Sequence, residues 1–140
     1  MKYLVDANIL SEATKPIPSP IVLKWLEANQ NNLIVNPIVL GELQYGILAL
    51  PDGKRKTKLL SWFARGLKAL HSVDIDGETA DRWAKLLAEL RAQGVAMPLN
   101  DSLIAASALQ HRLVIATRNT RDFAQSGVTL VNPFEEVSKP

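Results

Sequence analysis

The sequence predicts an α/β fold, with a central parallel sheet of about four or five strands and helices packed on its faces. Short runs rich in branched apolar residues alternate along the chain with segments of helical periodicity. Most of the helical segments begin at a residue that commonly caps or starts a helix. The chain has 140 residues and 47% hydrophobic residues, enough for a single domain over residues 1–140 with its own core.

Five short runs are expected to form the strands, because they are apolar and are bounded by polar or loop-forming residues. In chain order they cover residues 3–5, 33–35, 73–75, 113–116 and 128–131. The run at 113–116 is apolar throughout, which is typical of a strand covered on both faces. Because helical segments separate the runs, we expect parallel pairing with right-handed crossovers.

The helices are expected from capping residues that precede apolar periodicity. In order, the caps and starts are Asn8, Ser19-Pro20, Asn36-Pro37, Asp76 and Asn100. Gly94 is placed to end the helix capped by Asp76. The helix after Pro37 runs to about Ala49. A further helix, which follows the basic run Lys54–Lys58 and carries apolar residues as far as Leu70, completes a helical hairpin with it.

The stretch from Met97 to Phe123 carries two acids in a buried setting. If Asn100 caps the helix, Asp101 lies in the first turn, where the helix dipole favours an ionised carboxylate. Residues 103–109 are apolar on nearly every side, which indicates burial. Asp122 lies just beyond the strand at 113–116, in a polar loop.

Composition excludes several classes of protein. With no cysteine, the chain has neither a disulfide scaffold nor a thiolate metal site. No apolar run approaches membrane-spanning length, and an acid follows closely on the amino terminus, so we expect a cytoplasmic protein with no membrane contact. A net charge of +2 is too small to identify a nucleic-acid binder by itself.

Four acids lie at positions that a parallel sheet would bring together. Asp6 ends the first strand, Asp122 follows a later strand, Asp101 opens a helix, and Glu42 lies on an apolar helix face. The carboxyl ends of parallel strands meet at one edge of a sheet, and the helix that starts at Asp101 leads into the strand at 113, so its amino end belongs to the same edge. We therefore expect the acids to converge there.

Converging carboxylates without compensating cations repel one another, and a hard divalent cation is the usual remedy. Because the sequence offers oxygen ligands and no histidine or cysteine cluster, Mg²⁺ or Mn²⁺ is favoured over Zn²⁺. Such an ion lowers the pKa of a bound water and neutralises charge on a phosphate. The reaction that fits is hydrolysis of a phosphodiester bond.

Four segments also carry a family resemblance. They are Val5–Glu12 (VDANILSE), the helix with Glu42, Pro98–Ala106 (PLNDSLIAA) and Ala116–Phe123 (ATRNTRDF). Together they resemble the PIN-domain family, and more narrowly the VapC and FitB toxins of bacterial type II toxin–antitoxin pairs. The resemblance spans the whole chain. Each motif alone is weak, and their order and separation make the set specific.

The resemblance implies a metal-dependent endoribonuclease that cuts structured RNA such as tRNA or rRNA. By residue, it implies that Asp6, Glu42, Asp101 and Asp122 are the catalytic acids around Mg²⁺ or Mn²⁺. Polar neighbours that would orient an acid, a water or the phosphate are Asn8, Thr117, Asn119 and Arg118. The implied partners are a cognate antitoxin, which inserts into the active-site groove, and a second copy in a homodimer or a larger toxin–antitoxin assembly.

Two positions depart from the family pattern. Ala7 stands where a hydroxyl residue is common, and His111-Arg112 where glycine often closes the turn before the strand. The first removes one supporting hydrogen bond, and the second is interpreted as harmless.

Several interpretations remain open from the sequence. A PIN fold without catalysis, acting only by binding RNA or protein, is one alternative; a receiver-like signalling domain with Mg²⁺ is another, disfavoured because its adjacent acids and its lysine after a strand are missing. Arg118 either contacts the RNA backbone or pairs with Glu12 or another acid. For Lys54–Lys58, a solvated helix start is favoured over an RNA track.

Overall fold

The sheet lies at the centre of the molecule and is parallel throughout. The computed structural model describes residues 1–135, in which five strands are ordered β3-β2-β1-β4-β5. They are β1 (Tyr3–Val5), β2 (Leu33–Val35), β3 (His71–Ser72), β4 (Val114–Ala116) and β5 (Leu130–Val131). In register, Leu4 lies opposite Ile34 on one side and Ile115 on the other. The predicted α/β fold is confirmed, and β1, which leads into Asp6, is the central strand.

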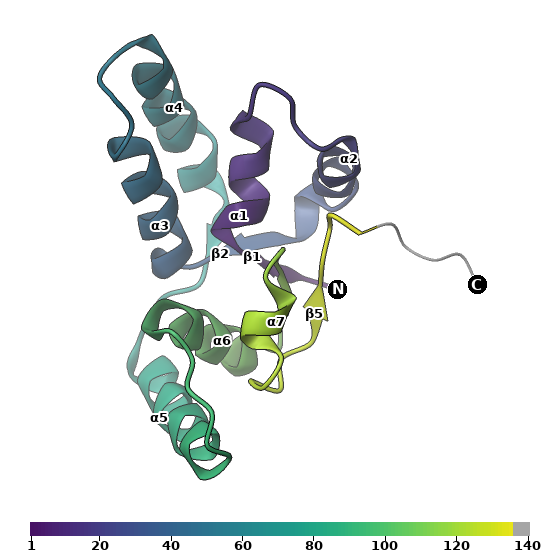
Figure 1. Ribbon diagram of the computed structural model, residues 1–140, viewed down its shortest axis with the longest axis vertical. Helices are drawn as coiled ribbons and strands as arrows, with labels where there is room; N and C mark the ends of the chain where they lie inside the picture. The colour runs from purple at the N-terminus through teal and green to yellow at the C-terminus, as the bar shows by residue number, and fades with distance from the viewer. Residues whose placement is uncertain (136–140) are drawn as a thin grey trace, which may run out of the picture.

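Helices connect successive strands and cover the sheet. The α-helices are α1 (Ala7–Leu10), α2 (Pro20–Ala28), α3 (Pro37–Leu48), α4 (Lys54–Arg65), α5 (Gly77–Ala92), α6 (Leu99–His111) and α7 (Thr120–Phe123), and the 3-10 helices are η1 (Ser11–Thr14), η2 (Gln30–Asn32) and η3 (Leu67–Ala69). The predicted hairpin of α3 and α4 lies at one end of the molecule, and α5 packs against α6 at the other (Figure 1). Within residues 1–135, no helix has the length and apolar character needed to cross a membrane.

The core is formed by the strands together with residues from all seven α-helices. Leu4 and Ile115 in the sheet and Ile104 in α6 are completely buried, as is Phe123 of α7. The all-round apolar character of residues 103–109 therefore reflects a helix enclosed by its neighbours, as predicted. This packing fixes the amino end of α6, where Asp101 lies, relative to the carboxyl edge of the sheet.

Two predicted helix starts are confirmed in detail. Asn36 caps α3, its side-chain oxygen accepting the Val39 N–H at 2.9 Å, and Pro37 follows as the first helical residue. Asp76 caps α5 in a capping box with Thr79, each side chain bonding the backbone N–H of the other. Such caps satisfy backbone donors that a helix end would otherwise leave free.

The predicted cap at Asn8 is wrong. The backbone of Asp6 is extended, with φ −70° and ψ 155°, and its carboxylate accepts the Ala7 N–H, so α1 begins at Ala7. Asn8 therefore lies inside the first turn.

The predicted cap at Asn100 is also wrong. Pro98 has φ −54° and ψ 146° and precedes a helix that begins at Leu99, without a side-chain cap. Asn100 is thus already helical and its side chain is exposed. Asp101 remains in the first turn, as predicted.

Four elements have bounds that differ from the prediction. The third strand is His71–Ser72 and not 73–75, because its register is set by pairing with Ile34 and Val35 of β2. Helix α4 ends at Arg65, so the apolar residues as far as Leu70 continue into η3 and beyond. Strands β4 and β5 are each shorter than the apolar runs that contain them.

Candidate functional site

Asp6 is a buried carboxylate held in one orientation by its neighbours. Its Oδ1 accepts the Ala7 N–H at 2.8 Å, and its Oδ2 accepts the Thr117 hydroxyl at 2.8 Å and the Asn8 amide at 3.3 Å. Burial nevertheless raises the pKa of Asp6 above its ordinary value, and these hydrogen bonds only partly oppose that shift; the charge of Asp122 adds to it. Asp6 is therefore oriented by hydrogen bonds without being neutralised by a cation.

Two more acids reach the same region from α3 and α6. Burial raises the pKa of Glu42, and the charges of Asp6 and Asp101 raise it further. Burial, followed by the charges of Asp6 and Asp122, raises the pKa of Asp101 to about 6. The expectation that the helix dipole would keep Asp101 readily ionised is wrong, because burial and the neighbouring carboxylates outweigh the dipole.

The acids line one cavity of about 470 Å³. Asp6, Glu42 and Asp101 all contribute to its wall, together with the polar side chains of Asn8 and Asn119. Three acids from distant segments of the sequence therefore line the same cavity, and their role there stays a prediction.

Asp122 takes a more peripheral place. It is exposed on α7 and does not line the cavity, but its charge raises the pKa of both Asp6 and Asp101. Within residues 1–135, no three Asp, Glu, His or Cys side chains lie close enough together to hold an ion as they stand. The acids are thus electrostatically coupled without forming a closed set of ligands.

Thr117 links the predicted orienting residues. Its hydroxyl donates to Asp6, accepts the Asn119 N–H at 3.0 Å and lies 3.4 Å from the Asn8 amide nitrogen, which donates to it. The Asn8 side-chain oxygen accepts the Arg118 N–H at 3.1 Å. The loop after β4 is therefore tied to the end of β1 through side chains that also hold Asp6.

The Arg118 side chain contacts an aromatic ring and does not line the cavity. Its guanidinium carbon lies 4.4 Å from the centre of the Phe134 ring, a cation–π contact. It forms no ion pair among the residues that the structure describes, although its charge contributes to lowering the pKa of Glu12. Of the two roles left open for Arg118, direct pairing with Glu12 is not seen.

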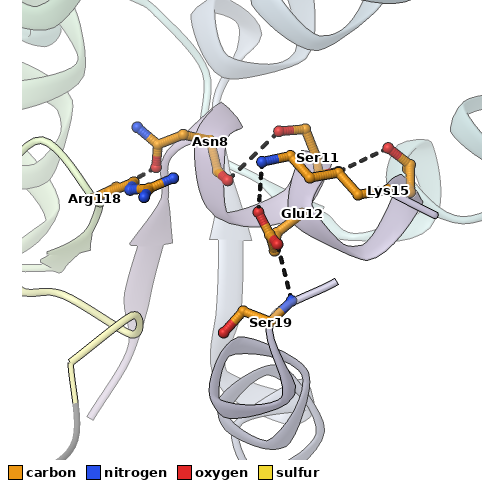
Figure 2. A network of polar contacts seen from close by, with 7 residues as sticks. Asn8, Ser11, Glu12, Lys15, Ser19 and Arg118 are labelled. Atoms are coloured by element: carbon orange, nitrogen blue, oxygen red, sulfur yellow. Dashed lines mark hydrogen bonds and ion pairs between the residues drawn. The ribbon is translucent and has the colours of Figure 1, made fainter. Parts of the chain in front are cut away.

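Glu12 is a second buried acid, and sequence reasoning missed its burial and its partners. Glu12 forms an ion pair with Lys15 at 2.8 Å and accepts the Ser19 N–H at 2.9 Å, which ties η1 to the start of α2 (Figure 2). Hydrogen bonds from Lys15 and Ser19 lower the pKa of Glu12. The i,i+3 spacing of Glu12 and Lys15 was the available signal.

The wall of the cavity formed by α4 was missed as well. Arg55 and Trp62 of α4 line the same cavity as the acids. The sequence marks Arg55 only as part of a basic run, and nothing local indicates that the hairpin folds over the acids.

Comparison with known proteins gives the family. The family model for the PIN domain matches residues 3–127. The chain belongs to the PIN domain family. The resemblance noted from the four sequence motifs is thereby confirmed.

Curated relatives span nearly the whole PIN-domain chain. The plasmid stability protein StbB of Pseudomonas syringae pv. tomato is 34% identical over 136 residues, covering 94% of this chain and 98% of the relative. The VapC ribonuclease Y4jK of Sinorhizobium fredii is 32% identical over 136 residues, covering 94% and 97%.

A toxin is similar in both sequence and structure. Toxin FitB of Neisseria gonorrhoeae is 29% identical over 137 residues, covering 95% of this chain and 99% of FitB. The crystal structure of FitAcB from the same organism superposes with a TM-score of 0.89 at 29% identity, covering 96% and 99% of the two chains. The PIN fold is therefore shared along nearly the full length.

The departure at Ala7 is compensated within this PIN domain. The backbone N–H of Ala7 bonds Asp6 Oδ1, and the hydroxyl that bonds Oδ2 comes from Thr117. The Asp6 carboxylate thus keeps hydrogen bonds on both oxygens without a hydroxyl side chain at position 7.

Proposed function

We propose that this PIN-domain protein is a divalent-metal-dependent endoribonuclease and the toxin of a type II toxin–antitoxin pair. The observation that carries the proposal is the cavity in which Asp6, Glu42 and Asp101 meet without a cationic side chain pairing any of them among residues 1–135. The relative from Sinorhizobium fredii is named a ribonuclease, and FitB is named a toxin. Those names support RNA as the substrate and an antitoxin as the partner.

The donor set fits a hard divalent cation, Mg²⁺ or Mn²⁺. The cavity offers carboxylate and amide oxygens, and Glu42 Oε1 is buried without a hydrogen-bond partner. Mg²⁺ keeps several of its waters and needs only one or two direct carboxylates, so a site without three converging ligands is compatible with it. When bound, such an ion neutralises charge on a phosphodiester and lowers the pKa of water.

We assign the residues as follows. Asp6 and Asp101 would hold the ion, with Glu42 supplying its unpartnered oxygen and Asp122 acting from the rim through its charge. Thr117 and Asn8 orient the Asp6 carboxylate, and their bonds to the Asn119 and Arg118 N–H groups fix the loop after β4.

We also propose a homodimer, formed through an apolar surface next to Glu42. Tyr45 on α3 is 75% exposed and Leu99 at the start of α6 is 61% exposed. Tyr45 and Glu42 line one shallow cavity with Ile38, so a second copy seated there would also close the outer side of the acidic site. We further propose a cytoplasmic location, which an RNA substrate supports.

The proposal is tested by incubating the purified protein with a total RNA pool in Mg²⁺, in Mn²⁺ or in EDTA and mapping the cut ends. We expect defined cuts with at least one ion and none in EDTA. Cutting that continues in EDTA would refute the metal site. RNA that is bound but never cut with either ion would instead support the PIN fold as a binding module without catalysis.

A further inference from the structure

Helix α4 opens with an unusual concentration of positive charge. Four of its first five residues are cations, Lys54, Arg55, Lys56 and Lys58, with no acid in the first turn. Cations at this end of a helix oppose the helix dipole and destabilise it, whereas an acid there would stabilise it. The preceding Gly53 supplies no side-chain cap. The local sequence is therefore poor for helix stability, and something other than stability has to explain these side chains.

Three of the four cations have no partner within the described part of the chain. Lys56 pairs with Asp52 at 3.1 Å, whereas Lys54, Arg55 and Lys58 are exposed and form no ion pair there. Their charges are available to an anion from outside the chain.

The same three cations line a groove that adjoins the acidic cavity. This basic groove has a volume of about 460 Å³, and its three cations share the wall with Thr14 and with the apolar residues Ala13, Leu59 and Trp62. Arg55, Thr14 and Trp62 also line the acidic cavity. The two spaces therefore lie side by side and share part of their walls, including Arg55.

We propose that the basic groove binds the backbone of the RNA substrate, with Lys54, Arg55 and Lys58 contacting phosphates next to the one that is cut. This inference rests on the proposed nuclease function and adds the path of the strand. The acids repel a polyanion, so adjoining cations are needed to offset that repulsion as the strand enters. Arg55, which faces both spaces, contacts the phosphate nearest the acids.

Charge removal tests the groove. The triple variant Lys54→Gln, Arg55→Gln, Lys58→Gln is combined with Asp6→Asn, so that binding is measured without cleavage. The probe is a short fluorescein-labelled single-stranded RNA of mixed sequence, and its anisotropy is followed against salt concentration. Three lost phosphate contacts lower the slope of log affinity against log salt by about 2, because each contact on a single strand contributes about 0.7.

A matched control removes the same charge elsewhere. Lys24, Lys85 and Arg91 are exposed on α2 and α5, and their replacement by Gln should leave the slope nearly unchanged. Thermal unfolding separates binding from folding: the groove variant should unfold at the same temperature as its parent or a higher one, since repulsion with the α4 dipole is removed. In the cleavage-competent background, KM should rise while kcat changes little.

Two results would overturn the inference. One is an equal change of slope in the groove and control variants. The other is loss of antitoxin binding with an unchanged RNA slope, which would assign the groove to the protein partner. Failure of the proposed nuclease function gives a different result from failure of this inference. In the first case the wild-type protein cuts no RNA, but the salt dependence of RNA binding still shows whether the groove contacts phosphates.

Discussion

Two buried acids that lie six residues apart have pKa values shifted in opposite directions. Asp6 is 5% exposed and Glu12 is 4% exposed. Hydrogen bonds from Lys15 and Ser19 lower the pKa of Glu12, whereas burial raises the pKa of Asp6, which has no cationic partner. A buried carboxylate that no cation pairs destabilises the fold, so such a residue is found where function requires it. We infer a structural role for Glu12, and the raised pKa of Asp6 supports its assignment to the proposed metal site.

This difference predicts how stability depends on pH when divalent ions are removed. The pKa of Asp101 is raised from 3.8 to about 6, and the pKa values of Asp6 and Glu42 are raised as well. Because the folded state holds these protons more tightly than the unfolded chain, stability is greatest below the unfolded pKa and is lost as the pH rises through the folded pKa. In EDTA, the temperature at the midpoint of thermal unfolding should decrease as the pH is raised from about 5 to about 7.

Asp101→Asn should remove part of this dependence. The pKa shift of Asp101 corresponds to at most about 3 kcal/mol, and screening at a half-buried group leaves about 1–2 kcal/mol. In EDTA at neutral pH the variant should therefore unfold a few degrees above wild type. A wild-type midpoint that rises over this pH range would contradict the account. Glu12 and Asp76, whose pKa values are lowered, act in the opposite direction, chiefly below about pH 5.

The helices and strands that could be predicted from the sequence are those that a local side-chain pattern specifies. The strand at 33–35 and the caps Asn36 and Asp76 are confirmed because a local pattern of apolar residues and capping side chains specifies them. Asn8 and Asn100 were misassigned as caps because each helix begins earlier, after the extended backbones of Asp6 and Pro98. Backbone conformation at such junctions depends on the sheet edge as well as on local residues.

The end of α6 offers a prediction at the scale of one helix. Arg112 ends the helix with φ 55°, a left-handed conformation that costs a non-glycine residue about 1 kcal/mol or more. Arg112→Gly should raise the free energy of unfolding by about 0.5–1 kcal/mol, because strain is relieved in excess of the added chain entropy. Chemical denaturation measures the change.

The matched control for that variant is Gly94→Ala. Gly94 has φ 71° after α5, so a side chain there introduces the strain that Arg112 already bears, and stability should fall. Destabilisation by Arg112→Gly would show that the arginine side chain has a role in holding the helix end.

In the whole molecule, the order of the strands in the sheet brings the acids of the site to one cavity. Central strand β1 places Asp6 between the ends of β2 and β4, so acids at positions 6, 42 and 101 meet although long stretches of sequence separate them. The sequence could predict this convergence, because parallel strands share a carboxyl edge. It could not predict that the hairpin brings Arg55 and Trp62 to the wall of the same cavity, since that depends on how α3 and α4 pack in three dimensions.

We propose that RNA is cut in the cavity lined by Asp6, Glu42 and Asp101. The most direct test of this proposal is the cleavage rate of one mapped RNA in Mg²⁺ or Mn²⁺ by wild type, Asp101→Asn and Asp81→Asn, where Asp81 is an exposed acid on α5. Groups that only support a metal ligand commonly contribute about 10–100-fold, so loss of Asp101 itself should lower the rate by about 100-fold or more. Asp81→Asn should cut as wild type does. Cleavage by Asp101→Asn at the wild-type rate would contradict the assignment of the site.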